Sequence, residues 1–156
     1  MPRLTTAGLA LTLIVFTSAG CGGPEPALRD KVIERTLQER IAHLRPDGRR
    51  VSLTEAGPSG WTRACVVQPY TDRRAIREAT GVEIRRSPWA GGDGHWGFIF
   101  IWKDKASYVV LPRAGGSDRG ETLRCWEHDQ HPSIVAFDDS TTAGHAFRAL
   151  KIVTND

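Results

Sequence analysis

Residues 98–112 read F-I-F-I-W-K-D-K-A-S-Y-V-V-L-P, two apolar runs separated by the charged segment K-D-K. The first run is apolar at every position from Phe98 to Trp102, as in a central strand with both faces buried. The charged segment and the second apolar run predict that the chain turns back on itself. This is the strongest hairpin signal in the sequence, and it places an antiparallel sheet at the centre of the fold.

Further strands are predicted on both sides of this hairpin, where apolar and β-branched residues gather between turn residues. They cover residues 51–53, 61–68, 121–128 and 133–137. The last segment, A-G-H-A-F-R-A-L-K-I-V at 143–153, fits either a helix or a turn that leads into a strand. No internal repeat is visible.

Two helices are predicted before the hairpin. Apolar residues recur at helical spacing over residues 27–44, and Pro46-Asp47-Gly48 ends this helix. Thr71 or Asp72 can cap a second, shorter helix, which Gly81 ends. Because helices precede an antiparallel run of strands, we expect an α+β fold, with an N-terminal helix and a second short helix packed on an antiparallel β-sheet.

Length and charge limit the classes of function. The chain has 156 residues, of which 40% are hydrophobic and 25% are charged, as expected for one globular domain. Its formal net charge of +3 is too small an excess to indicate a nucleic-acid partner. No motif in the sequence indicates a cofactor or a catalytic set.

The N-terminal segment has a different character. Arg3 is the only charged residue before Glu25, and residues 7–16 are all apolar or small. A basic residue, a short apolar run and then small residues are the layout of a secretory signal peptide. The apolar run is well short of the roughly 20 residues that cross a bilayer as a helix. Ser18-Ala19-Gly20-Cys21 resembles the lipobox of bacterial lipoproteins, with serine where leucine is usual.

The lipobox resemblance implies a lipoprotein signal peptide at 1–20 and a lipidated Cys21 that begins a short tether, residues 21–26. Residues 27–156 then form the single α+β domain. Each buried methylene of an acyl chain such as palmitate contributes about 0.8 kcal/mol, and two or more chains give stable anchoring. The expected location is the bacterial cell envelope, on a membrane and facing the periplasm or the exterior. The alternative is secretion with Cys21 as a plain thiol.

The other two cysteines then form an even pair, since the sequence contains three in all. In an oxidising compartment a disulfide between Cys65 and Cys125 is the default expectation. It would close a loop of about 60 residues and stabilise the fold by roughly 4 kcal/mol. Two buried free thiols are the alternative, and nothing in the sequence activates either cysteine for catalysis.

Residues 61–113 also resemble small uncharacterised bacterial envelope lipoproteins. Trp61, Cys65-Val66-Val67, Pro69-Tyr70-Thr71 and Leu111-Pro112-Arg113 carry this resemblance. The resemblance implies the architecture and the envelope location, and it confers no activity.

Three further clusters are candidate sites. His128 and His131 could ligate zinc or copper, but we favour a polar turn, because a metal site needs three or four ligands in fixed geometry. Trp89 and Trp96 lie in the glycine-rich loop 87–97 and are a candidate partner-binding surface, unless both rings pack against the sheet. The densest basic segment is a solvated helix face or a surface for lipid head groups or an acidic partner; it consists of Arg73, Arg74, Arg77, Arg85 and Arg86.

The preferred hypothesis is a membrane-anchored, noncatalytic lipoprotein whose domain binds another envelope protein or a surface polymer. A periplasmic module for a small ligand or a metal is the alternative, and a hydrolase is the third class. A deep pocket with converging polar groups would favour either alternative.

Overall fold

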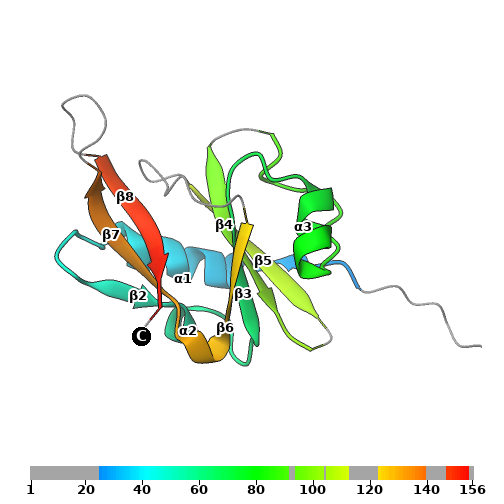
Figure 1. Ribbon diagram of the computed structural model, residues 1–156, viewed down its shortest axis with the longest axis horizontal. Helices are drawn as coiled ribbons and strands as arrows, with labels where there is room; N and C mark the ends of the chain where they lie inside the picture. The colour runs from blue at the N-terminus through cyan, green and yellow to red at the C-terminus, as the bar shows by residue number, and fades with distance from the viewer. Residues whose placement is uncertain (1–24, 92–93, 104, 113–122, 140–146, 155–156) are drawn as a thin grey trace, which may run out of the picture.

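A computed structural model describes residues 25–91, 94–103, 105–112, 123–139 and 147–154. It shows a mixed α/β fold with three α-helices, in which most elements are strands (Figure 1). The strands form a five-stranded sheet with the order β1-β5-β4-β3-β6 and a three-stranded sheet with the order β2-β7-β8.

The five-stranded sheet is built around the hairpin that the sequence predicts. β4 (His95–Ile101) and β5 (Ala106–Pro112) are its antiparallel strands. β3 (Arg63–Val67) pairs with β4, and β6 (Leu123–Glu127) pairs with β3, both antiparallel. β1 (Leu28–Arg29) is a two-residue strand that runs parallel to β5 at one edge of the sheet.

The three-stranded sheet joins segments that are far apart in the sequence. β2 (Arg50–Ser52) pairs with β7 (Ser133–Asp139), and β7 pairs with β8 (Phe147–Val153), all antiparallel. The final segment therefore contains a strand, which was one of its two interpretations. A single sheet is too simple an expectation, because alternating apolar residues identify strands without saying which strands pair.

The helices begin at aspartates that cap them. Asp30 accepts hydrogen bonds from the amides of Val32 and Ile33 at the start of α1 (Lys31–Ala42). The periodicity predicts a helix from Ala27, but residues 28 and 29 are extended because they pair with Ser107 and Tyr108 of β5.

Asp72 caps α3 (Arg73–Thr80) through the amide of Ala75, and Gly81 ends that helix in the left-handed conformation, as the sequence predicts. Two shorter helical elements remain. They are the one-turn α-helix α2 (Leu53–Ala56), directly after β2, and the 3₁₀ turn η1 (His128–Gln130), directly after β6.

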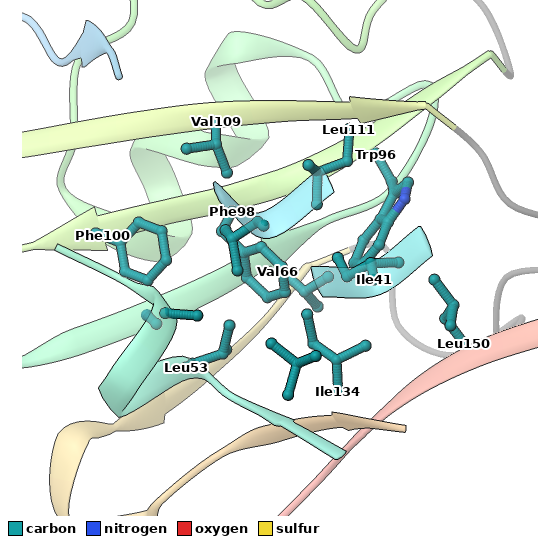
Figure 2. Close-up of a cluster of buried hydrophobic side chains, with 14 of the residues drawn as sticks. Ile41, Leu53, Val66, Trp96, Phe98, Phe100, Val109, Leu111, Ile134 and Leu150 are labelled. Carbon is teal, nitrogen blue, oxygen red and sulfur yellow. The ribbon is translucent and has the colours of Figure 1, made fainter. Parts of the chain in front are cut away.

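Two cores lie on opposite faces of the five-stranded sheet, because successive side chains of a strand point to opposite faces. On β4, Phe98 and Phe100 belong to the first core and Ile99 to the second. The first core is closed by residues of α1, α2 and the three-stranded sheet, among them Ile41, Leu53, Ile134 and Leu150 (Figure 2). The second is closed by α3 and the segment after it, through Ile76, Val82, Ile84 and Trp89. Full burial of such a side chain stabilises the fold by about 1.5–3 kcal/mol.

The disulfide crosses from β3 to β6. Cys65 and Cys125 are directly opposite each other in the antiparallel ladder, and their sulfur atoms are bonded. The expected pairing is confirmed. The bond ties the edge strand β6 to the centre of the sheet, across a sequence separation of 60 residues.

Candidate functional site

The two tryptophans of the glycine-rich loop are buried, with exposed fractions of 0% for Trp89 and 6% for Trp96. The indole of Trp89 lies over Gly97, where an added Cβ would come within 3.1 Å of the ring, and it meets Tyr108 edge-on. Trp96 packs edge-on against Phe98 and donates a 3.1 Å hydrogen bond to the carbonyl of Pro112.

An exposed aromatic surface at residues 87–97 is therefore a wrong expectation, and the packing alternative describes both rings. The error comes from the glycines. In sequence they indicate a mobile loop, whereas Gly97 lies inside β4 and its missing side chain leaves room for the Trp89 indole.

His128 and His131 lie in and just after the turn η1, with ring centres 6.4 Å apart. The turn is closed by Gln130, whose side chain accepts a 2.8 Å hydrogen bond from the amide of Glu127. His128 also packs edge-on against Trp61. Within the described ranges, no group of three or more His, Cys, Asp and Glu side chains is arranged to hold a metal ion. This geometry is that of a capped polar turn.

Cys21 and the rest of residues 1–24 lie outside the described part of the chain. The signal peptide, the lipid on Cys21 and residues 21–24 of the tether stay predictions. None of the helices among the described residues combines the length and the apolar character needed to cross a membrane.

Three hollows meet where the described chain begins, and Glu25 lines each of them. Their volumes are about 400, 520 and 300 Å³. They lie mainly between residues 25–30, 80–86, 101–103 and 105–107. We call this surface the tether end, because the chain leaves the domain here toward the predicted tether.

Strand pairing brings these segments together. β1 pairs with residues 107 and 108 near the start of β5, and Arg63 at the start of β3 lies opposite Ile101 at the end of β4. The amide of Ala27 donates a 2.8 Å hydrogen bond to the carbonyl of Glu83, which joins the first segment to the chain after α3. In Figure 1 the blue start of the described chain lies on the side of α3, and β7 and β8 lie on the other side.

Basic residues outnumber acidic ones at the tether end. The three acidic lining residues are Glu25, Asp30 and Glu83. Asp30 caps α1, and a carboxylate oxygen of Glu83 lies 3.7 Å from a guanidinium nitrogen of Arg77. Six lining residues are basic: Arg29, Arg63, Arg85, Arg86, Lys103 and Lys105. The sequence places Asp104 between the two lysines, outside the described residues. Local charge at this surface is therefore positive.

A large apolar side chain of this surface is exposed, and a second lies close to it in sequence, in the first turn of α1. Leu28 is 70% exposed and Val32 is 76% exposed, and in the described part of the chain only Tyr70 joins them as a large exposed hydrophobic residue. Trp102 is half-buried, with the Lys105 ammonium 5.3 Å from its ring centre and its own Nε1 donating to the carbonyl of Ser59. The tether end therefore combines cations, the exposed side chain of Leu28 and an aromatic ring, and the exposed Val32 follows shortly after it in the first turn of α1.

Glu34 fastens the start of the domain from within. Its carboxylate accepts hydrogen bonds from the Arg29 guanidinium at 2.8 and 2.9 Å, from the Lys31 ammonium at 3.0 Å and from the Val110 amide at 2.9 Å. Burial raises the pKa of Glu34, but these donors outweigh burial and lower the pKa to about 2. The same contact raises the pKa of Arg29. One carboxylate therefore joins β1, α1 and β5.

Glu34 is a residue that the sequence reasoning missed. A signal was present, because Glu34 lies three residues before Leu37 and seven before Ile41, which places it on the buried stripe of α1. An acidic residue on a buried stripe implies a charged or amide partner.

In comparisons with protein-family models, with curated proteins and with solved structures, nothing matched the chain.

Proposed function

We propose that the protein is a lipoprotein of the bacterial cell envelope, held to a membrane by acyl chains on Cys21. Its folded domain is a noncatalytic interaction domain that binds another envelope protein or a surface polymer. The observation that carries this proposal is the disulfide between Cys65 and Cys125. Structural disulfides are typical of exported proteins, and this one leaves Cys21 as the only cysteine of the chain outside a pair.

The start of the domain supports an anchor close to the fold. Ala27 is already buried and hydrogen-bonded to Glu83. Only six residues lead from Cys21 to Ala27, so even a fully extended tether spans roughly 20 Å. An acyl chain on Cys21 would hold the domain against the membrane surface.

A small-ligand module is the second candidate, and one observation favours it. Ser107 Oγ is buried and has no hydrogen-bond partner among the described residues, and Ser107 lines the hollow of about 400 Å³ at the tether end. That volume is in the range of small-molecule sites. A polar ligand that raises the Tm of the wild type but not of Ser107→Ala would favour this module over the interaction domain.

The anchor is tested by labelling cells with radioactive palmitate and separating membranes from the soluble fraction. We expect label in the wild-type protein and its recovery with membranes. Cys21→Ser should carry no label and should leave the membrane fraction, because residues 7–16 are too short to span a bilayer. Ser18→Leu is the matched control, and it should be labelled at least as well as the wild type. Absence of palmitate from both the wild type and Ser18→Leu would refute the lipoprotein proposal.

A further inference from the structure

We propose that the tether end is the face that rests on the membrane, where its cations bind the anionic head groups of phospholipids and Leu28 and Val32 enter the interface. This inference rests on the proposed anchor at Cys21 and adds an orientation and a lipid class to it. It concerns described residues alone, since the six basic side chains and both aliphatic side chains lie within the described ranges.

The place where the chain leaves the fold sets the orientation of the domain on the membrane. The hydrogen bond from Ala27 to Glu83 fixes the chain at the tether end. A tether of six residues keeps this end within roughly 20 Å of the acyl chains. α1 leads away from it for 12 residues, about 18 Å, toward the three-stranded sheet (Figure 1). The tether end is therefore the part of the domain nearest to the bilayer.

The charges of the tether end suit an anionic membrane surface. Lys103 and Lys105 lie in the connection between β4 and β5, and both are exposed. Arg85 and Arg86 are also exposed, on the segment that follows α3. Long cationic side chains at a membrane surface place their charges at the depth of the lipid phosphates, and anionic lipids attract such clusters. The positive balance of this surface complements an anionic leaflet.

Apolar and basic side chains occur together at the tether end. A single exposed aliphatic side chain is common on proteins. Leu28, however, lines two of the hollows, one together with Arg85 and Arg86 and the other together with Lys105. Val32 lies four residues further along the chain, in the first turn of α1. Protein surfaces that contact the membrane interface typically combine aliphatic side chains with cations. Tryptophan side chains such as Trp102 also favour the interface, at the level of the lipid head groups.

Tyr70, the third exposed hydrophobic residue, provides the internal comparison. It follows the Val67 end of β3, whereas Arg63 at the other end of that strand lines the tether end. A label at residue 70 should therefore stay in water when a label at residue 32 contacts lipid.

The experiment uses full-length acylated protein in vesicles of phosphatidylcholine, with and without phosphatidylglycerol. Val32→Cys and Tyr70→Cys each carry a spin label, whose accessibility to a water-soluble and to a lipid-soluble relaxation agent is measured. In vesicles with phosphatidylglycerol, we expect the label at 32 to lose several-fold in water accessibility and to gain in lipid accessibility. The accessibility of the label at 70 to both agents should not change.

Charge reversals test the role of the cations. One variant carries Lys103→Glu/Lys105→Glu and a second carries Arg85→Glu/Arg86→Glu. In each variant we expect the label at 32 to regain its accessibility to the water-soluble agent. Arg40→Glu/Arg45→Glu is the matched control at the far end of α1, where both arginines are exposed, and it should leave the label in lipid. The Tm of each variant is compared with that of the wild type. If one of the two charge-reversal variants misfolds, the other still tests the role of the cations.

The outcomes separate this inference from the proposed function. If the protein floats with the vesicles while the label at 32 stays as accessible to water as the label at 70, the orientation is wrong and the anchor stands. If the label at 32 is protected from the water-soluble agent equally well in vesicles without phosphatidylglycerol, the proposed binding of anionic head groups is wrong. Protein that carries no acyl chain and does not float would refute the proposed function itself.

Discussion

At the edge of the five-stranded sheet, the side chain of Glu34 makes a hydrogen bond that a neighbouring strand would otherwise make. β1 covers β5 only at residues 107 and 108, so the backbone of Val110 lies beyond its end. The Glu34 carboxylate accepts from the Val110 amide, and the Gln38 side chain donates to the Val110 carbonyl at 3.4 Å. An uncovered strand edge is a template for unwanted pairing. Two side chains of α1 therefore protect the edge that β1 leaves open.

The low pKa of Glu34 predicts a loss of stability in acid. The folded-state pKa is about 2, below the ordinary value of 4.5, so the stabilisation is complete above pH 4.5 and is lost as the pH falls toward 2. A difference of this size corresponds to about 3 kcal/mol. Urea unfolding of the wild type at neutral pH and at about pH 3 should show most of this loss.

The variant Glu34→Gln isolates this carboxylate. It should be less stable than the wild type by about 3 kcal/mol at neutral pH, because Arg29 and Lys31 lose their charged partner. It should also lose most of the dependence between pH 4.5 and 2. Glu39→Gln, at an exposed position of the same helix, is the control and should behave like the wild type. A full acid dependence in Glu34→Gln would assign the effect to other carboxylates.

Gly97 makes room for Trp89, so adding one methyl group there should destabilise the protein. A Cβ at residue 97 would overlap the carbonyl of Val109 and press on the indole. Overpacking of this kind typically costs about 1–3 kcal/mol, and we expect Gly97→Ala to lower the Tm by several degrees. Gly91→Ala is the matched control, because no atom of the described part of the chain lies within 4 Å of its added Cβ. Equal Tm values for the two variants would contradict this packing.

Among the elements, β6 depends on a covalent bond for its attachment. It is an edge strand that pairs only with β3 in the described part of the chain, and the disulfide joins the two at Cys65 and Cys125. The bond closes a loop of 60 residues. Its main stabilising effect in the chain-entropy account is to restrict the unfolded chain.

Removal of the disulfide should therefore cost roughly 4 kcal/mol of unfolding free energy, less any strain. Cys65→Ala/Cys125→Ala, compared with the oxidised wild type in urea, measures this cost. Mass spectrometry of the unreduced digest should show the two cysteine peptides linked. Free thiols at both positions would remove the bond from this account.

Local signals predicted the elements whose causes are local. The hairpin at 98–112 follows from two apolar runs and a charged turn, and α3 follows from Asp72 and Gly81 at its ends. The pairing of β2 with β7 joins residues more than 80 positions apart, and no local pattern contains that information. The same limit applies to the site. The contact of Trp89 with Gly97 and that of Glu34 with Val110 are properties of neighbouring elements.

At the scale of the whole molecule, one sheet separates two cores of different construction. The first core is shared between helices and a second sheet, and it holds Phe98, Phe100 and Trp96. The second lies under α3 and the segment after it, and it contains Cys65 and Trp89. In Figure 1 the described chain begins on the side of α3, and the three-stranded sheet lies on the other side, away from the proposed membrane. That side is left for the proposed envelope partner.

The parallel pairing of β1 has a mechanical consequence. If a partner pulls on the domain while Cys21 is held in a membrane, the tension enters through Ala27 and runs along the axis of β1. The bonds between β1 and β5 and the ion pair of Arg29 with Glu34 are then loaded in shear, all at once. Bonds that share a load resist it better than bonds that open one after another. Among the strands of the described residues, the shortest would therefore be the one through which such a force enters the fold.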